Sequence, residues 1–413
     1  MISINRHILP NGLRVIHHKD ITTSMVAINV LYNVGARDEQ PDKTGFAHLF
    51  EHLMFGGSVN IPDFDGPLQM AGAENNAWTS NDVTNYYECI PADNLEIAFW
   101  LESDRMLSLD FSQESLNVQK NVVIEEFKQR NLNQPYGDVQ MLLRPLAYKV
   151  HPYQWNTIGK EPAHIANATL DEVKDFFYRF YAPNNAVLSV AGNVEFEEVL
   201  RLSEKWFALI PKREVTPKNI PQEPDQTEAR FLEVERNVPA DAIFKVYHMC
   251  AKTHPDYPVY DLISDLLASG NSARLYQSLV QEQKLFSEVN AFISGDVDAG
   301  LFHIKGKPVN GISLEEADKA IQTEIDKLLH EPISDYEMEK VKNKFEANQV
   351  FSEINYQNKA TNLALYELIS KAEDINFEVD KYRAITVEQM KSVASTLFRK
   401  ENCSRLYYRR EKR

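Results

Sequence analysis

Short runs of apolar and β-branched residues at the start of the chain predict strands. Segment 12–17 follows a Pro-Asn-Gly turn, and segment 25–32 (MVAINVLY) is almost entirely apolar or β-branched. Segment 76–90 is rich in Thr, Val and Tyr, so we expect it to be extended as well. The first third of the chain therefore predicts a sheet.

Helical periodicity follows in the same third of the chain. Segment 44–55 contains no proline, Thr44 is suited to cap its start, and the glycine pair 56–57 is suited to end it. Segments 95–107 and 115–130 also repeat apolar residues at helical spacing. Strands and helices mixed in this way predict an α+β fold.

A polar, proline-rich stretch divides the chain. Segment 211–230 holds four prolines and has no periodic apolar pattern, which is typical of a linker. We therefore predict a first domain at 1–212, a linker at 213–230 and a second domain at 231–413.

The two halves end in similar ways. Segment 169–174 (TLDEVK) corresponds to 386–391 (TVEQMK), and Asn185 before a strand corresponds to Asn402 before another. The pattern predicts two similar α+β domains, each with a mostly antiparallel sheet packed with helices.

Composition narrows the class of function. The 413 residues are enough for two domains, and the formal net charge of −16 disfavours nucleic acid and anionic membrane surfaces as partners. Runs of Lys and Arg are no longer than Arg409-Arg410 and Lys412-Arg413.

Neither a disulfide framework nor a membrane segment is expected. Cys89, Cys250 and Cys403 are far apart and show no CxxC spacing. The start of the chain lacks the pattern of a signal peptide, and its apolar runs are too short to span a bilayer. We expect a cytoplasmic protein, unless a leader preceding residue 1 has been removed.

The strongest chemical signal is His48-Leu-Phe-Glu51-His52. On a helix, residues four apart share one face, so both imidazoles can reach one metal ion. Glu51 lies beside them and can take a proton from a metal-bound water. This HxxEH order is the inverzincin signature, for which the alternative is accidental spacing. Neutral imidazole ligands favour zinc over manganese or cobalt, although they do not exclude these metals.

A third ligand is suggested by the helical pattern of 115–130. Leu116, Val123 and Phe127 form an apolar stripe, and Glu126 falls within that arc whereas Glu125 falls outside it. A carboxylate among apolar residues needs a cationic partner. Glu126 is therefore predicted to be a metal ligand or, alternatively, one side of a buried salt bridge, and Glu125 a solvated charge.

Together these residues resemble peptidase family M16, which includes pitrilysin, insulin-degrading enzyme and mitochondrial processing peptidase. The segments that carry the resemblance are 35–37 (GAR), 45–55 (GFAHLFEHLMF), 76–79 (NAWT), 84–86 (TNY), 122–126 (VVIEE) and 181–185 (YAPNN). The resemblance implies the LuxS/MPP-like metallohydrolase fold and a zinc-dependent endopeptidase that cleaves short or unfolded peptides in an enclosed chamber.

The resemblance also implies a role for each site residue. His48, His52 and Glu126 would hold one zinc ion, and Glu51 would be the general base. Asn76 and Ala77 would lie on an edge strand that pairs with an extended peptide. The chain length resembles that of subunits that form dimers.

The sequence departs from the family pattern at three places. Gln119 stands where many active members carry a supporting Glu, and 261–265 (DLISD) replaces the metal motif in the second half. Val280 and Ser287 occupy the positions of an Arg and a Tyr that help to position the substrate carbonyl. This implies either a heterodimer with a metal-less subunit that supplies Arg and Tyr, or a homodimer with a modified site.

Two other readings remain open. The same HxxEH order occurs in S-ribosylhomocysteine lyases, which are shorter and use a catalytic cysteine. A non-catalytic assembly subunit is the other alternative, although the four residues of the metal site are all present.

Overall fold

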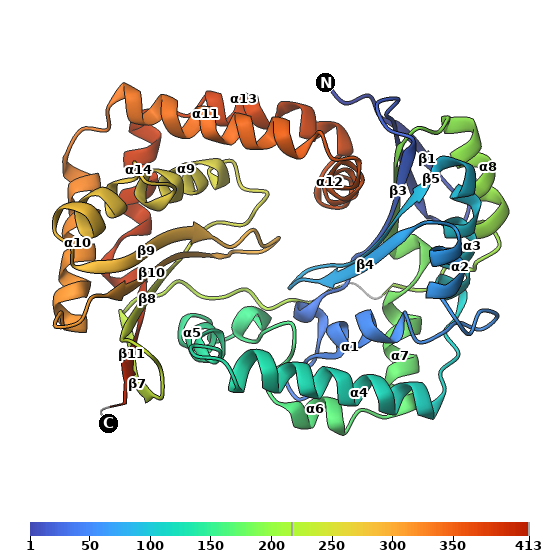
Figure 1. Ribbon diagram of the computed structural model, residues 1–413, viewed down its shortest axis with the longest axis horizontal. Coiled ribbons are helices and arrows are strands. Elements are labelled where there is room, and N and C mark those ends of the chain that lie inside the picture. Colours follow the sequence, from blue (N-terminus) through green and yellow to red (C-terminus); the bar gives the residue numbers. More distant parts are fainter. Residues whose placement is uncertain (216–217, 412–413) are drawn as a thin grey trace. The chain divides into compact units, whose positions relative to one another are not determined.

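The structure, a computed structural model, describes residues 1–215 and 218–411 (Figure 1). It contains two compact units, each built from three segments: unit 1 comprises Met1–Gln129, Trp155–Ile220 and Val350–Phe377, and unit 2 comprises Arg130–Gln154, Pro221–Gln349 and Glu378–Arg413. Residues 216–217 of the predicted linker and 412–413 of the basic end lie outside the described residues. The domains predicted at 1–212 and 231–413 stay a prediction. The compact units differ from these ranges, because residues 350–377 of the second half belong to unit 1 and residues 130–154 of the first half belong to unit 2.

Unit 1 contains a six-stranded sheet. Its strands are β1 (Asn5–Ile8), β2 (Arg14–Lys19), β3 (Met25–Tyr32), β4 (Glu74–Thr79), β5 (Thr84–Pro91) and β6 (Ala186–Gly192), in the order β1-β2-β6-β3-β5-β4. Strands β2 and β6 are parallel, and the other neighbouring strands are antiparallel. The predicted strand at 25–32 is β3 with the same bounds. Segment 76–90, expected to be extended, is a hairpin of β4 and β5.

The helices of unit 1 cover this sheet and build the layer that carries the predicted metal motif. They are α1 (Phe46–Leu53), α2 (Asp65–Met70), α3 (Leu95–Leu107), α4 (Gln113–Phe127), α6 (Pro162–Ala166), α7 (Leu170–Phe180), α8 (Phe196–Phe207) and α12 (Tyr356–Ile369). The helix predicted at 95–107 has these bounds in the structure. The helix predicted at 115–130 begins earlier, because the Ser112 side chain accepts a hydrogen bond from the Ser115 amide and caps it.

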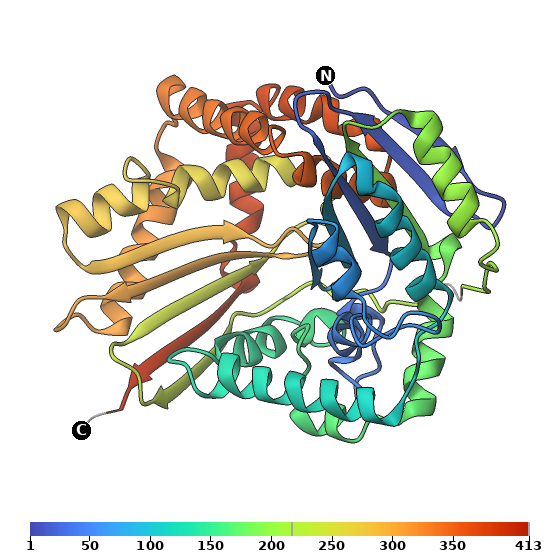
Figure 2. The same ribbon diagram turned by 45° about the vertical axis from the view of Figure 1, so that its right-hand side comes forward.

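Unit 2 contains a five-stranded sheet. Its strands are β7 (Arg230–Arg236), β8 (Ala242–His248), β9 (Phe286–Ile293), β10 (Leu301–Pro308) and β11 (Cys403–Arg410), in the order β7-β11-β8-β10-β9. Its helices are α5 (Val139–Ala147), α9 (Tyr257–Ala268), α10 (Leu314–His330), α11 (Asp335–Ser352), α13 (Glu378–Arg383) and α14 (Val387–Leu397), of which α11 ends within unit 1. Figure 2 shows the strands of this sheet, from yellow-green to red, as one twisted layer.

The predicted repeat is confirmed at the level of hydrogen bonds. Helices α7 and α14 both begin with a threonine capping box, at Thr169 and Thr386. The side-chain amide of Asn185 donates to the Phe180 carbonyl at 2.8 Å, and the side-chain amide of Asn402 donates to the Leu397 carbonyl at the same distance. In each sheet the strand that follows is parallel to one neighbour and antiparallel to the other. The expected α+β class is therefore correct.

Each unit depends on a helix from the opposite half of the sequence. In unit 1, α12 lies on β3 and β6, and its Leu363 and Ala364 are fully buried beside Leu31. Lys359 on the same helix forms an ion pair with Asp20, with 2.5 Å between Nζ and Oδ2. In unit 2, α5 supplies buried residues to a core that includes strands β8 and β11. The sequence-based domain boundaries do not include these exchanges.

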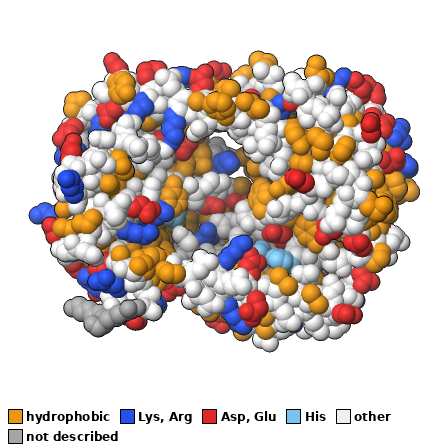
Figure 3. Space-filling model, in the orientation of Figure 1, with side chains coloured by type: hydrophobic (Ala, Val, Ile, Leu, Met, Phe, Trp, Pro, Cys, Tyr) orange, Lys and Arg blue, Asp and Glu red, His pale blue; other side chains and the backbone are white. Residues whose placement is uncertain are grey.

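The distribution of charged side chains and the state of the cysteines follow the expectations from composition. Acidic and basic side chains are interspersed over the face drawn in Figure 3. All three cysteines are free thiols. Among the described residues, every helix is too short or too polar to cross a bilayer.

Truncation of Leu363 tests the exchange of α12. We expect Leu363→Ala to lower the free energy of unfolding by roughly 2–5 kcal/mol, because the side chain is fully buried. Urea denaturation measures the change. Ile354→Ala is the control, since Ile354 is 68% exposed. Equal effects of the two substitutions would contradict the packing described here.

His303 predicts a pH dependence of stability. It lies on β10 with its ring stacked on Phe292, and burial, with a smaller effect of Arg144, lowers its pKa to about 3. Below the ordinary histidine pKa of about 6.5, the unfolded chain gains a proton that the folded chain does not. The stability advantage of His303→Phe over the wild type should therefore grow as the pH falls from 7 to 5 in urea titrations. An advantage that does not change with pH would refute this assignment.

Candidate metal centre

The start of helix α1 is fixed by the backbone conformation of Gly45 and by contacts with Glu39. Gly45 precedes the helix with φ 90°, in the left-handed region that favours glycine, and a Cβ there would lie 2.8 Å from the Ile158 carbonyl oxygen. The Glu39 carboxylate accepts hydrogen bonds from the amides of Gly45 at 2.9 Å and Ala47 at 2.8 Å. Burial raises the pKa of Glu39 well above its ordinary value, whereas these two amides act in the opposite direction.

Glu39, and not Thr44, therefore provides the side-chain contacts at the start of α1. The Thr44 hydroxyl instead lies 2.8 Å from Nδ1 of His164. The expectation that Thr44 caps the helix was wrong. The carboxylate that accepts the first amides belongs to Glu39, which precedes the helix by several residues, so the spacing of residues at the start of the helix does not reveal it. The helix is also shorter than the predicted 44–55.

The back of α1 is fixed by aromatic packing. Phe50, between the two histidines, is fully buried, and its ring stacks on Phe176 at 4.8 Å and on Tyr181 at 5.2 Å. Leu49 and Leu53 are buried as well. Burial of this face prevents rotation of the helix, which leaves the histidines and Glu51 on a defined opposite side.

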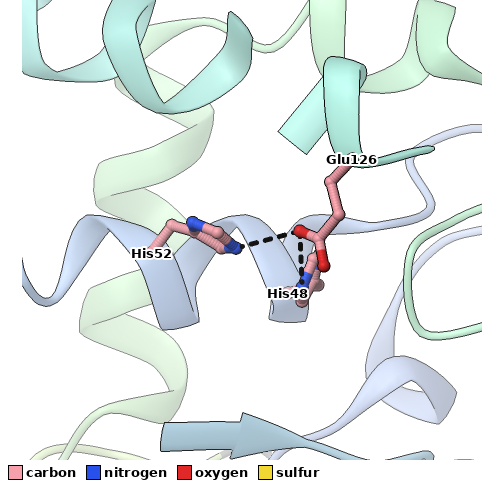
Figure 4. A group of neighbouring side chains, drawn as sticks. All are labelled: His48, His52 and Glu126. Carbon is pink, nitrogen blue, oxygen red and sulfur yellow. Dashed lines mark ion pairs between the residues drawn. The ribbon is translucent and has the colours of Figure 1, made fainter. Parts of the chain in front are cut away.

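The structure brings His48 and His52 of α1 to Glu126 of α4 (Figure 4). Oε2 of Glu126 lies 3.5 Å from Nε2 of His48 and 3.4 Å from Nε2 of His52. Nitrogen and oxygen ligands lie about 2.0–2.2 Å from zinc, so neighbours in a tetrahedral site are roughly 3.3–3.6 Å apart. The three side chains therefore fit one zinc ion. Among the described residues, they are the one group of three His, Cys, Asp or Glu with ligand atoms within 4.8 Å of one another.

The two adjacent glutamates of α4 differ as the periodicity predicts. The Glu126 side chain is 19% exposed and lies in the cluster. The Glu125 side chain is 63% exposed and pairs with Lys128 on the surface at 2.6 Å. Leu116, Val123 and Phe127 are buried, which confirms the apolar stripe. A carboxylate on that side of the helix needs a positive partner, and the cluster provides a position for one.

Glu51 is held from strand β4. The Thr79 hydroxyl at the end of β4 donates to Oε2 of Glu51 at 2.5 Å. Thr79 thus restrains one oxygen of a carboxylate that directly precedes His52 on α1 and is not part of the cluster. Thr79 belongs to segment 76–79, which carries the family resemblance, but the sequence indicates no role for it, because its contact with Glu51 spans 28 positions.

The end of β4 is fixed by the loop at Gly35. A Cβ on Gly35 would lie 2.5 Å from the Asp82 amide nitrogen, so only glycine allows this approach. Arg37 then pairs with Asp82, with 3.1 Å between NH1 and Oδ1, in a largely buried contact. The loop and the β4–β5 turn therefore lock together and position Thr79.

The other residues predicted to contribute to the site, Asn76, Ala77 and Gln119, lie on strand β4 and helix α4. Asn76 and Ala77 are on β4, the edge strand of the sheet, where the Asn76 side chain accepts a hydrogen bond from the Ala77 amide at 2.8 Å. Gln119 is partly exposed on α4, seven residues before Glu126. Their predicted roles in binding and electrostatic support stay predictions.

The second half replaces the metal motif with polar contacts. Asp265 on α9 pairs with Lys344 at 2.9 Å, and Asp261 accepts a hydrogen bond from the Tyr382 hydroxyl at 2.8 Å. An ammonium group and a hydroxyl thus satisfy the two carboxylates that stand where the repeat has histidines.

The two positions where the family pattern has an Arg and a Tyr are occupied by Val280 and Ser287, whose side chains cannot position a substrate carbonyl in the same way. Val280 packs against the core of unit 2, and the Ser287 hydroxyl donates to the Lys307 carbonyl at 3.1 Å. Nearby Arg274 is engaged by Glu337 at 2.7 Å, and the Tyr276 hydroxyl accepts from the Gln281 amide.

Comparisons of the sequence and of the fold with known proteins find peptidases of one family. Residues 14–161 match the sequence model described as Insulinase (Peptidase family M16), and residues 167–345 match the one described as Peptidase M16 inactive domain. The chain is 33% identical over 346 residues to the zinc protease PqqE of Helicobacter pylori, across 81% of this chain and 76% of that protein. It is 25% identical over 405 residues to the uncharacterized zinc protease YmxG of Bacillus subtilis, across 96% of each. A crystal structure of a protease from Helicobacter pylori has a TM-score of 0.93 and 28% identity, across 99% of this chain and 100% of that one.

Removal of the Glu126 charge should weaken metal binding. We expect Glu126→Gln to reduce zinc affinity by at least about tenfold, because an amide is a poorer ligand than a carboxylate. Zinc titration against a competing chelator measures the affinity, with Glu125→Gln as the matched control. Equal affinity in the two variants would show that Glu126 is not a ligand.

Proposed function

The chain belongs to peptidase family M16, and we propose that it is a zinc-dependent endopeptidase acting on short or unfolded peptides. The observation that carries the proposal is the cluster of His48, His52 and Glu126 at zinc-ligand spacing, with Glu51 on the same helix as the two histidines. Three protein ligands leave one position of a tetrahedral site for water, which is the arrangement of catalytic zinc.

The residues of the site divide the chemistry among them. Zinc bound by the three ligands would polarise the scissile carbonyl and lower the pKa of a bound water. Glu51 would take a proton from the attacking water and deliver it to the amine of the leaving peptide. Thr79 donates to one oxygen of Glu51 and so restrains the orientation of its carboxylate.

Strand β4 is suited to bind the substrate backbone. It lies at the edge of the sheet and carries Asn76 and Ala77, so an extended peptide can add to it as a further strand. Main-chain pairing of this kind recognises an extended backbone and tolerates different sequences. The hydrogen bond from the Ala77 amide to the Asn76 side chain competes with such pairing at that amide.

The proposal includes a partner subunit. Val280 and Ser287 cannot replace the Arg and Tyr of the family pattern, and Arg274 is bound to Glu337. These observations favour a dimer in which a metal-less subunit supplies the missing side chains and encloses the chamber. A homodimer with a modified site is the alternative, and a non-catalytic subunit is the third possibility.

The thiols do not support the lyase reading. Burial raises the pKa of Cys89 to about 11 and that of Cys250 to about 12. Burial also raises the pKa of Cys403. Because the thiolate is the reactive form, none of the three is prepared for acid–base or nucleophilic catalysis near neutral pH.

Glu51→Gln separates catalysis from metal binding. We expect this variant to keep one zinc ion per chain and to lose about 10²–10⁴-fold in cleavage of a quenched mixed-sequence peptide, since it cannot accept a proton. Chelator should abolish the wild-type activity. Glu125→Gln, a change at an exposed and paired carboxylate, should cleave like the wild type.

The isolated chain distinguishes the forms of the proposal. Cleavage by the chain alone would show that Arg and Tyr from a second kind of subunit are dispensable. Zinc binding without cleavage would support the heterodimer, and co-purification would follow. Failure to bind zinc would contradict the proposed function and favour the non-catalytic subunit.

A further inference from the structure

Unit 2 contains a cavity of about 530 Å³ between its sheet and helix α10. The volume lies in the range of small-molecule sites, roughly 300–1,000 Å³. Its lining includes five cationic side chains and two acidic ones: Arg230, Lys245, Lys319, Lys400 and Arg405, against Glu315 and Asp318. A local excess of positive charge is notable in a chain with a net charge of −16.

Two of these cations lie side by side within the sheet. Lys245 of β8 and Arg405 of β11 are directly opposite in the antiparallel ladder, a position where like charges destabilise a sheet. Lys245 is only 3% exposed. The next pair on the same face, Ile243 opposite Tyr407, belongs to the core, so the cations interrupt an otherwise apolar layer.

One carboxylate is shared between the two cations. Oδ1 of Asp318 lies 2.8 Å from Nζ of Lys245, and its Oδ2 contacts the guanidinium of Arg405. Although burial acts to raise the pKa of Asp318, Lys245 and Arg405 hold it below the ordinary value, so the group is ionised at neutral pH. The cluster therefore keeps a net positive charge.

The cluster also retains an unused donor. Nε of Arg405 is buried and has no hydrogen-bond partner among residues 1–215 and 218–411. A buried donor without a partner is costly unless an acceptor reaches it.

The rim of the cavity adds cations that are not neutralised. Lys319 and Lys400 are exposed, and their ammonium groups have neither an ion pair nor a hydrogen bond within the described part of the chain. Glu315, the second acidic group of the lining, is bound by Arg409 at 2.5 Å. The rim can therefore attract an anion toward Lys245 and Arg405.

The rest of the wall is apolar and aromatic. Tyr247 and Phe398 are buried, with ring centroids 5.1 Å apart. Phe231 is 49% exposed, and its ring lies 5.0 Å from the guanidinium carbon of Arg405. A ligand with an apolar body can bury surface against these rings.

We propose that this cavity binds a small organic anion. Its carboxylate or phosphoryl group lies among Lys245, Arg405, Lys319 and Lys400, and its apolar body lies against Phe231 and Phe398. The site belongs to unit 2 and is independent of the proposed peptidase activity.

Binding of simple probes to the full-length, zinc-loaded chain tests this site. Phenyl phosphate and phenylacetate share an apolar ring and differ in the anionic group, and benzyl alcohol is their neutral counterpart. Isothermal calorimetry should show saturable binding of at least one anionic probe, and the tighter of the two identifies the head group. The neutral probe should bind at least about tenfold more weakly, since it lacks the charge that the cations attract.

Two exposed lysines provide a variant that leaves the fold intact. Lys319→Ala/Lys400→Ala should weaken the anionic probe by at least about tenfold, whereas Lys252→Ala, in the same unit but outside the lining, should leave its affinity unchanged. His48→Ala should also leave this binding unchanged, which separates the cavity from direct binding to zinc. The proposal is overturned if neither anionic probe binds, if the neutral probe binds equally well, or if the double variant binds like the wild type.

Discussion

Glu126 places a carboxylate on the buried side of α4, and the site is organised around the need to compensate that charge. Two imidazoles from α1 lie 3.4 and 3.5 Å from one of its oxygens. Neutral imidazoles alone do not balance a carboxylate, whereas a divalent cation at their common centre does. Helix α1 has to keep its position for this to work. Its start is held by Glu39 and its back by Phe50, and both contacts are buried.

The same fold is used twice, with different chemistry in each copy. In unit 1 the helix motif presents two histidines, and in unit 2 the corresponding aspartates are satisfied by Lys344 and Tyr382. Shared capping boxes and asparagine hydrogen bonds show that the scaffold is retained although the site is not. Unit 2 is then free to use its own sheet face differently, and the cross-strand pair of Lys245 and Arg405 is such a difference.

Local patterns in the sequence were sufficient to predict several of the elements and the grouping of two histidines with Glu126. Strand β3 follows from its run of apolar residues, and the placement of Glu126 inside the arc of α4 follows from helical periodicity. Contacts between distant segments could not be predicted in this way. The bond from Thr79 to Glu51, the carboxylate of Glu39 at the start of α1 and the docking of α12 on β3 depend on three-dimensional proximity, which spacing along the chain does not reveal.

The most direct test of the metal centre is a crystal structure of the purified chain with anomalous diffraction data collected on both sides of the zinc absorption edge. We expect one strong anomalous peak that vanishes below the edge. It should lie about 2.0–2.2 Å from Nε2 of His48, Nε2 of His52 and a carboxylate oxygen of Glu126. A peak elsewhere, or a protonated ion pair between Glu126 and the histidines with no metal in zinc-supplemented crystals, would contradict it.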